Sequence, residues 1–149
     1  MSNTHGGYVT PQRISPEEYR ARIPKVRDAV ERAGLAGLIA FGDCWRSANV
    51  SYFTEFRPLD GVSDIANALV WLSNTEEPVL FVSDQCVDYA RSATLFEVAS
   101  LRELAARLSD TSVARRGGRV GLAGAAYIPA ALLDRVRAAL GSATLEPTM

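Results

Sequence analysis

Paired carboxylates are the first side chains in this sequence that could do chemistry. Asp60 and Asp64 are four residues apart, and so are Asp84 and Asp88. This spacing can place two carboxylates on one face of a helix. A metal site would need a histidine or further acids arranged beside them, and neither pair has these neighbours. We therefore interpret both pairs as solvated surface charges.

Other motifs for enzyme chemistry are absent or incomplete. His5 is the only histidine, and it lies in the polar segment 1–14, a predicted flexible arm that could not hold it against a nucleophile or a metal. The patterns GxxxxGK[ST], HExxH and GxSxG do not occur. The run GRVGLAGAAYIP, residues 118–129, has glycines where a phosphate cradle could form, but it lacks the GxGxxG spacing. Close packing of a strand against a helix is the favoured role of these glycines.

One aromatic stretch, NVSYFTEFRP at residues 49–58, combines three rings with an arginine. Its spacing fits neither a strand nor a long amphipathic helix. Tyr52 and Phe53 are equally compatible with the core and the surface, because rings supply much of the buried area in small domains. Phe56 and Arg57 are predicted to be exposed, since they precede a proline and the polar stretch LDGVSD.

A second aromatic candidate follows the first predicted strand. Trp45 and Arg46 should emerge at the end of the sheet, where crevices form in α/β folds. An exposed tryptophan beside an arginine is typical of an interface anchor. The candidates for a substrate pocket or an interface are therefore Trp45, Arg46, Tyr52, Phe56 and Arg57.

Composition excludes several classes of partner. The 16 basic and 17 acidic residues give a net charge of −1, so no overall field favours nucleic acid or an acidic membrane surface. The apolar runs are far shorter than the ~20 residues of a membrane span, and the first residues do not resemble a signal peptide. We predict a cytoplasmic protein that binds neither nucleic acid nor membrane.

Cys44 and Cys86 form no CxxC pair and are expected to be reduced, buried thiols, although a disulfide between them is compatible with the sequence.

The elements that must position these residues alternate between strands and helices. SPEE at residues 15–18 supplies an N-cap and a capping box for a helix that closes at Gly34, with a kink at Pro24 or a later start. Strands are predicted at 36–43, 67–73, 78–83, 96–100, 119–124 and 143–147, helices near 85–92, 101–108 and 128–140, and a surface turn at 114–118. This order predicts an arm at 1–14 and one α/β domain at 15–149. The domain is expected to be a three-layer α/β/α sandwich with a mixed, about six-stranded sheet containing one antiparallel hairpin.

Five segments in this order resemble the N-terminal domain of the creatinase/prolidase family, the pita-bread metallohydrolases that include Xaa-Pro aminopeptidases and dipeptidases. They are AGLAGLIAFGD, NVSYFTEF, ANALVWLSNTEEPVLFVS, GRVGLAG and IPAALLDRVRAALGSATLEP. The resemblance covers residues 20–147. In NVSYFTEF, Phe53 replaces the family's leucine and Glu55 replaces its glycine, which puts the local backbone conformation in question.

The resemblance implies a non-catalytic domain that packs against its own catalytic domain and a second subunit of a homo-oligomer. It also implies that the two divalent metal ions, such as Mn²⁺, belong to the catalytic domain and that this chain holds no cofactor. The segment after Phe56 would border a substrate pocket, where Arg57 could bind a substrate carboxylate. Alternatively, Arg57 pairs with Asp60 or Asp64 and holds the loop. The substrate, an Xaa-Pro peptide or a creatine-like molecule, stays open, and so does a stand-alone interaction or small-ligand-binding domain.

Overall fold

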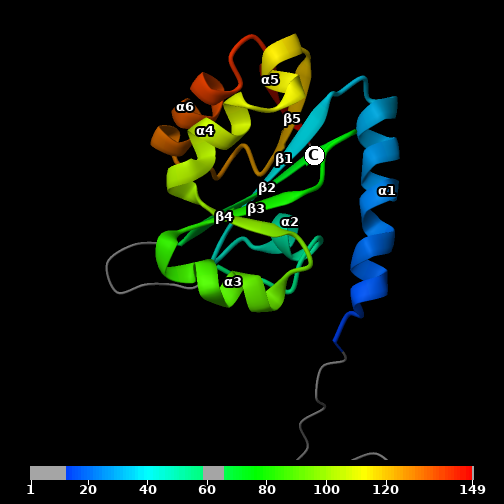
Figure 1. Ribbon diagram of the computed structural model, residues 1–149, viewed down its shortest axis with the longest axis vertical. Coiled ribbons are helices and arrows are strands. Elements are labelled where there is room, and N and C mark those ends of the chain that lie inside the picture. Colours follow the sequence, from blue (N-terminus) through cyan, green and yellow to red (C-terminus); the bar gives the residue numbers. More distant parts are fainter. Residues whose placement is uncertain (1–12, 59–65, 149) are drawn as a thin grey trace, which may run out of the picture.

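Six strands form one mixed sheet at the centre of the protein (Figure 1). The computed structural model describes residues 13–58 and 66–148. The strands are β1 (Gly37–Asp43), β2 (Asn67–Ser73), β3 (Val79–Val82), β4 (Glu97–Ser100), β5 (Arg119–Ala123) and β6 (Thr144–Thr148), in the spatial order β4-β3-β2-β1-β5-β6. Strand β2 is antiparallel to both β1 and β3, and the other neighbours are parallel. The α/β class, the mixed sheet and the hairpin β2–β3 are confirmed, and β1–β2 is an antiparallel pair that was not predicted.

Helix α1 (Pro16–Arg32) begins where the SPEE motif predicts. The Ser15 hydroxyl accepts a hydrogen bond from the backbone N–H of Glu18 at 3.2 Å, which satisfies one of the donors left free in the first turn. The helix continues through Pro24, so the alternative of a later start is wrong. Gly34 follows the helix with φ of +70°, a left-handed conformation that glycine adopts without steric cost.

Helices cover both faces of the sheet (Figure 1). One layer contains α1, α2 (Ala48–Ser51), the short helix η1 (Asp84–Cys86) and α3 (Val87–Ala93). The opposite layer contains the short helix η2 (Leu101–Glu103), α4 (Leu104–Ser109), α5 (Ser112–Arg116) and α6 (Ala130–Ala139). Neither α2 nor α5 was predicted. The predicted surface turn at 114–118 is partly wrong, because Thr111 caps α5 through a hydrogen bond to Ala114 N–H and the helix continues to Arg116.

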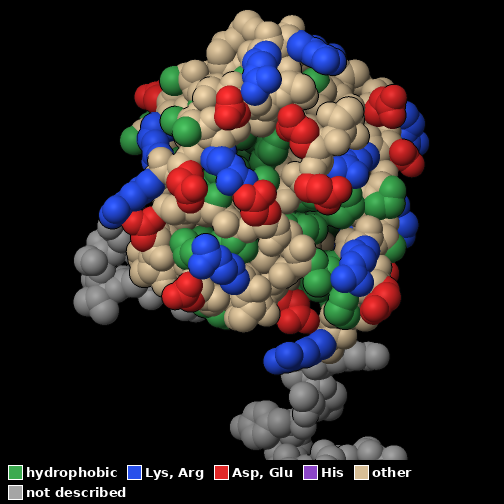
Figure 2. Space-filling model, viewed as in Figure 1, with side chains coloured by type: hydrophobic (Ala, Val, Ile, Leu, Met, Phe, Trp, Pro, Cys, Tyr) green, Lys and Arg blue, Asp and Glu red, His purple; other side chains and the backbone are tan. Residues whose placement is uncertain are grey.

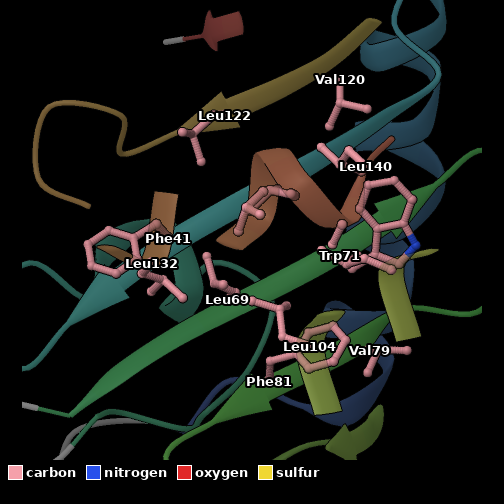
Figure 3. Close-up of a cluster of buried hydrophobic side chains, with 14 of the residues drawn as sticks. Phe41, Leu69, Trp71, Val79, Phe81, Leu104, Val120, Leu122, Leu132 and Leu140 are labelled. Atoms are coloured by element: carbon pink, nitrogen blue, oxygen red, sulfur yellow. The ribbon is translucent and has the colours of Figure 1, made fainter. Parts of the chain in front are cut away.

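Two buried clusters result from the alternation of side chains along the strands. In β2, Leu69 and Trp71 point toward α4, α5 and α6, whereas Val70 and Leu72 point toward α1, α2 and α3. Figure 3 shows the first cluster, in which Phe81 of β3 and Leu104 of α4 lie between the sheet and its helices. The sheet, whose central strands β1, β2 and β3 are almost entirely buried, thus gives the strand ends fixed positions from which the loops emerge.

The outer strands of the sheet are protected. Beside β4, Phe96 N–H donates to the Thr94 hydroxyl at 3.2 Å and Ser100 N–H donates to the Glu103 carboxylate at 3.0 Å. Alternate residues direct their backbone groups to the same side of a strand, so these bonds occupy the outward N–H groups on either side of Val98 in β4. In β6, Thr144 N–H donates to the carbonyl oxygen of Gly118, the residue before β5, at 2.8 Å. The same alternation places Pro147, which has no N–H, on the outward side.

Candidate interface site at the carboxyl end of strand β1

Asp43, the last residue of β1, organises the turn that follows the strand. Asp43 is 2% exposed, and one oxygen of its carboxylate accepts hydrogen bonds from the backbone N–H groups of Trp45 at 2.9 Å and Arg46 at 2.7 Å. The other oxygen accepts from Arg46 Nε at 3.1 Å and Nη2 at 2.6 Å. These four bonds fix residues 45 and 46 at the point where the sheet ends.

The Arg46 side chain extends toward the loop that follows the neighbouring strand, β5. Its guanidinium lies 4.5 Å from the centre of the Tyr127 ring, within cation–π range. Tyr127 follows β5, and β5 is parallel to β1, so the carboxyl ends of the two strands adjoin. Trp45 is 74% exposed and Tyr127 51% exposed. We call Trp45, Arg46 and Tyr127 the β1-end surface.

The ion pair beneath this surface is fully charged at neutral pH. Burial by itself raises the pKa of Asp43, but the hydrogen bonds from the Arg46 side chain and from the backbone of Arg46 and Trp45 outweigh burial, and the pKa is lowered. The hydrogen bond to Asp43 raises the pKa of Arg46. Because the arginine's charge is matched by a buried carboxylate, the two exposed rings dominate what the β1-end surface offers a partner.

The aromatic stretch divides into buried and exposed residues. Phe53 is buried, Tyr52 is 42% exposed, and Arg57 is exposed as predicted. The prediction that Phe56 lies on the surface is wrong, because its ring is fully buried against Tyr89 of α3, with 5.4 Å between ring centres. The inward turn is fixed by the Thr54 hydroxyl, which accepts the Phe56 N–H at 2.8 Å.

Glu55 stands where the family motif has glycine, and the structure accommodates it without strain. No described residue other than glycine has a positive φ, so this position needs no left-handed backbone. Its side chain is exposed. The substitution therefore adds a carboxylate to the surface and leaves the chain path intact.

Arg22 of α1 contacts the aromatic stretch at Tyr52. Its Nη1 donates to the Tyr52 carbonyl at 2.8 Å and its Nε donates to Glu18 at 3.0 Å. The guanidinium lies 4.8 Å from the centre of the Tyr52 ring and 5.3 Å from that of Tyr19. Arg22 was not predicted as a site residue, because nothing in its helical context distinguishes it from an ordinary surface arginine.

The structure does not bring all predicted candidates together. Trp45 and Arg46 share the β1-end surface, as their position after the first strand predicts, whereas Tyr52 and Phe56 lie on the α1–α3 side of the sheet. Arg57 reaches toward the start of α2, where its Nη1 lies 3.5 Å from the Ser47 hydroxyl. Its alternative partners Asp60 and Asp64 lie outside the described residues.

Beside the aromatic stretch is a hollow of about 320 Å³. It lies between the start of α1, residues 53–55 and the segment 92–95 that ends α3. Its lining is apolar at Ile14, Pro16, Tyr19, Phe53, Ala93 and Leu95, and polar at Arg13, Ser15, Thr54, Glu55, Ser92 and Thr94. Figure 2 shows hydrophobic side chains near the lower end of α1 with acidic and basic side chains around them.

The glycine turn after β5 is closely packed. Gly124 has φ of +89°, and a side chain there would begin 2.9 Å from the Phe41 carbonyl oxygen. The close packing predicted for these glycines is present, but its nearest partner is strand β1, and helix α2 contributes through Asn49, 3.1 Å from the same position. A side chain at Gly121, within β5, would likewise begin 3.0 Å from Leu35 Cδ1.

The titratable side chains and the helices of the described residues bear on metal binding and on membrane insertion. Within residues 13–58 and 66–148, no three His, Cys, Asp or Glu side chains are grouped to hold a metal ion. Asp84 and Asp88 pair separately with Arg102 at 2.6 Å and Arg91 at 3.4 Å. None of the helices in this part of the chain has the length and apolar character needed to cross a membrane. Cys86 is buried, Cys44 is half-buried, and these two described thiols form no disulfide.

Comparison with known proteins gives a family and a shared fold. The family model described as the creatinase/prolidase N-terminal domain matches residues 22–149. A proline dipeptidase structure from Streptococcus agalactiae 2603V aligns with a TM-score of 0.66 at 14% identity, over 87% of this chain and 94% of that chain. The creatinase/prolidase N-terminal domain of an X-Pro dipeptidase from Streptococcus pyogenes gives 0.65 at 16% identity, over 85% and 92%.

A longer structure shows the same fold as part of a larger chain. Recombinant prolidase from Thermococcus sibiricus aligns with a TM-score of 0.67 at 16% identity, over 87% of this chain and 34% of that chain. No curated protein matched this sequence.

Proposed function

The chain belongs to the creatinase/prolidase N-terminal domain family, and from this membership we propose that it is the non-catalytic N-terminal domain of a metal-dependent Xaa-Pro aminopeptidase or dipeptidase, or of a creatinase-like hydrolase, in the cytoplasm. The observation that carries the proposal is the family match over residues 22–149. The alignment with one third of a prolidase chain supports it. Two divalent metal ions, such as Mn²⁺, would be held by the catalytic domain.

Within this proposal, the β1-end surface docks against the catalytic domain. Trp, Tyr and Arg are the residue types that dominate binding energy at protein interfaces, and Asp43 holds Trp45 and Arg46 in place before any partner arrives. Thr148 of β6 pairs with Ala123 of β5, and both strands run parallel to β1. A domain that continues from β6 would therefore begin at the same end of the sheet as the β1-end surface.

The coding sequence beyond Met149 tests the proposal directly. We expect an open reading frame roughly twice as long as this chain, since the chain covers 34% of the prolidase, with two aspartates, a histidine and two glutamates as metal ligands. A stop codon after Met149 would contradict it. A stand-alone interaction protein is the second candidate, because the exposed rings of the β1-end surface are present in this chain itself, and the stop codon would favour it.

An activity assay provides a second test. The chain alone should not hydrolyse Xaa-Pro dipeptides or creatine in the presence of manganese, cobalt or zinc, because the proposed ligands lie in the catalytic domain. Turnover above the blank that disappears when the metal is removed would show that the catalytic machinery is in this chain.

A further inference from the structure

The hollow beside the aromatic stretch combines apolar side chains with polar groups that have unused hydrogen-bonding capacity. It has a volume of about 320 Å³. Of its apolar lining residues, Ile14 and Leu95 are exposed and Phe53 is buried, so the apolar lining runs from the surface to the core. This volume is at the lower end of the range for small-molecule sites. It suits a ligand of about the size of an amino acid or a dipeptide.

Tyr19 gives the hollow a hydroxyl group without a partner. The residue is 7% exposed and lines the hollow, and no described residue forms a hydrogen bond with its hydroxyl. The oxygen is not enclosed, because Ser51 Oγ is the only fully buried side-chain nitrogen or oxygen without a partner in the described part of the chain. The Tyr19 hydroxyl therefore opens into the hollow. Since polar groups of buried residues are normally hydrogen-bonded, it points to a ligand there.

Three further hydroxyl groups of the lining keep a proton available for a ligand. Ser15, Thr54 and Thr94 each accept a hydrogen bond from a backbone N–H, at 3.2, 2.8 and 3.2 Å. A hydroxyl also has one proton to donate, and none of these three donates it to another described residue. Thr54 is 2% exposed, so its donor is costly to leave unpaired. The hollow is therefore rich in donors, which a carboxylate would accept.

Arg13 and Glu55 give the hollow one charge of each sign. Both line it, and neither forms a salt bridge with another described residue. Arg13 precedes the first turn of α1, where the helix dipole also favours negative charge. Burial and the Glu55 carboxylate raise the pKa of Tyr19, so the hydroxyl is protonated at neutral pH and lies near Glu55. The hollow thus presents a basic group and an acidic group to the same ligand.

We propose that the hollow binds a small zwitterion with an apolar side chain, of the class of a free amino acid or a dipeptide. The ligand's ammonium group contacts Glu55 and the Tyr19 oxygen. Its carboxylate contacts Arg13 and the hydroxyl groups of the lining, and its side chain packs on Phe53 and Leu95. The site goes beyond the proposed domain role, because every group that it uses belongs to this chain and none to the catalytic domain.

L-leucine and L-leucyl-L-leucine are the probes, with the chain as it is. In a heteronuclear NMR titration, both should cause saturable shifts of the amide signals of residues 13–15, 53–55 and 92–95. Two derivatives of leucine are the ligand controls, since N-acetylleucine lacks the ammonium group and leucinamide lacks the carboxylate. Each should bind at least about tenfold more weakly than leucine, because hydrogen bonds to one charged group are lost.

Two substitutions test the acidic group and the hydroxyl. Glu55→Gln should weaken the binding of leucine at least about tenfold and leave that of N-acetylleucine unchanged, because the derivative has no ammonium group. Glu31→Gln is the matched control, because Glu31 is an exposed glutamate in the last turn of α1, away from the hollow. Tyr19→Phe should weaken the binding of leucine about two- to tenfold. It should not lower the melting temperature, since the hydroxyl has no partner in the protein.

Four results would overturn the proposal. They are the absence of saturable shifts in these residues with both probes, derivatives that bind as tightly as leucine, a Glu55→Gln variant that binds leucine like the parent chain, and a Tyr19→Phe variant that does so. None of these results would affect the reading-frame test, so the proposed domain role is judged separately.

Discussion

Replacing Asp43 by alanine should lower the free energy of unfolding far more than expected for a residue at the junction of a strand and a loop. The carboxylate accepts hydrogen bonds from two backbone N–H groups and from the Arg46 side chain. A hydrogen bond to a charged group contributes about 1.5–3 kcal/mol, and removing a side chain that caps backbone N–H groups costs about 0.5–2 kcal/mol. Since water can reach the freed groups in a surface turn, we expect a loss of about 2–4 kcal/mol of unfolding free energy for Asp43→Ala.

Urea denaturation gives the measurement. Trp71, which is 2% exposed, reports on global unfolding by fluorescence, and Trp45, which is 74% exposed, reports on the turn, so a Trp45→Phe background separates the two. Asp88→Ala is the matched control, because Asp88 is an exposed aspartate paired with Arg91, and should cost at most about 0.5 kcal/mol. An Asp43→Ala variant as stable as Asp88→Ala would refute the role given to the carboxylate.

The stability that Asp43 contributes depends on pH, because the pKa of its carboxyl is lowered in the folded protein. An aspartate in the unfolded chain has a pKa of about 3.9, so the unfolded state takes up the proton first as the pH falls. The stabilisation from Asp43 is present above this pH and is lost as the pH falls through the folded-state pKa. The difference in unfolding free energy between the parent chain and Asp43→Asn should shrink across this acidic range. A constant difference would show that the charge of Asp43 is not responsible.

Two further substitutions test the packing. Phe56→Ala should cost about 3–5 kcal/mol in urea denaturation, because the ring is fully buried, whereas Tyr52→Ala should cost much less; equal losses would contradict the inward position of Phe56. Gly124→Ala should cost more than about 1 kcal/mol in the same assay, because φ is +89° and the new carbon would lie 2.9 Å from the Phe41 carbonyl oxygen, and a neutral result would mean that the turn can relax.

The regular elements of the fold were predictable because local patterns and burial agree. The apolar run at 36–43 became β1, and the N-cap at Ser15 began α1 where predicted, although the Glu18 carboxylate pairs with Arg22 and does not complete the predicted capping box. Helix α2 is only four residues long, too short to show a periodic pattern. Phe56 was misplaced because the neighbouring proline and polar residues indicate a loop, whereas its inward position depends on the Thr54 hydroxyl and on packing against Tyr89 of α3.

The β1-end surface could be predicted from the sequence only for those of its residues that lie in a single segment. Trp45 and Arg46 follow a strand, and the position alone places them at the end of the sheet. Tyr127 joins them across more than eighty residues because β5 pairs with β1, and a single sequence gives no sign of that pairing. Asp43 could have been found, since an acid that ends an apolar strand is costly to bury unless it is bonded.

Protection of both outer strands limits how concentrated chains can aggregate. An open edge is a template on which strands add without end, as in fibres. On β4, Thr94 and Glu103 occupy the N–H groups on either side of Val98, and on β6 Pro147 offers none. Chains that meet edge to edge therefore gain few backbone hydrogen bonds. The sheet therefore resists growth into a filament through either of its outer strands.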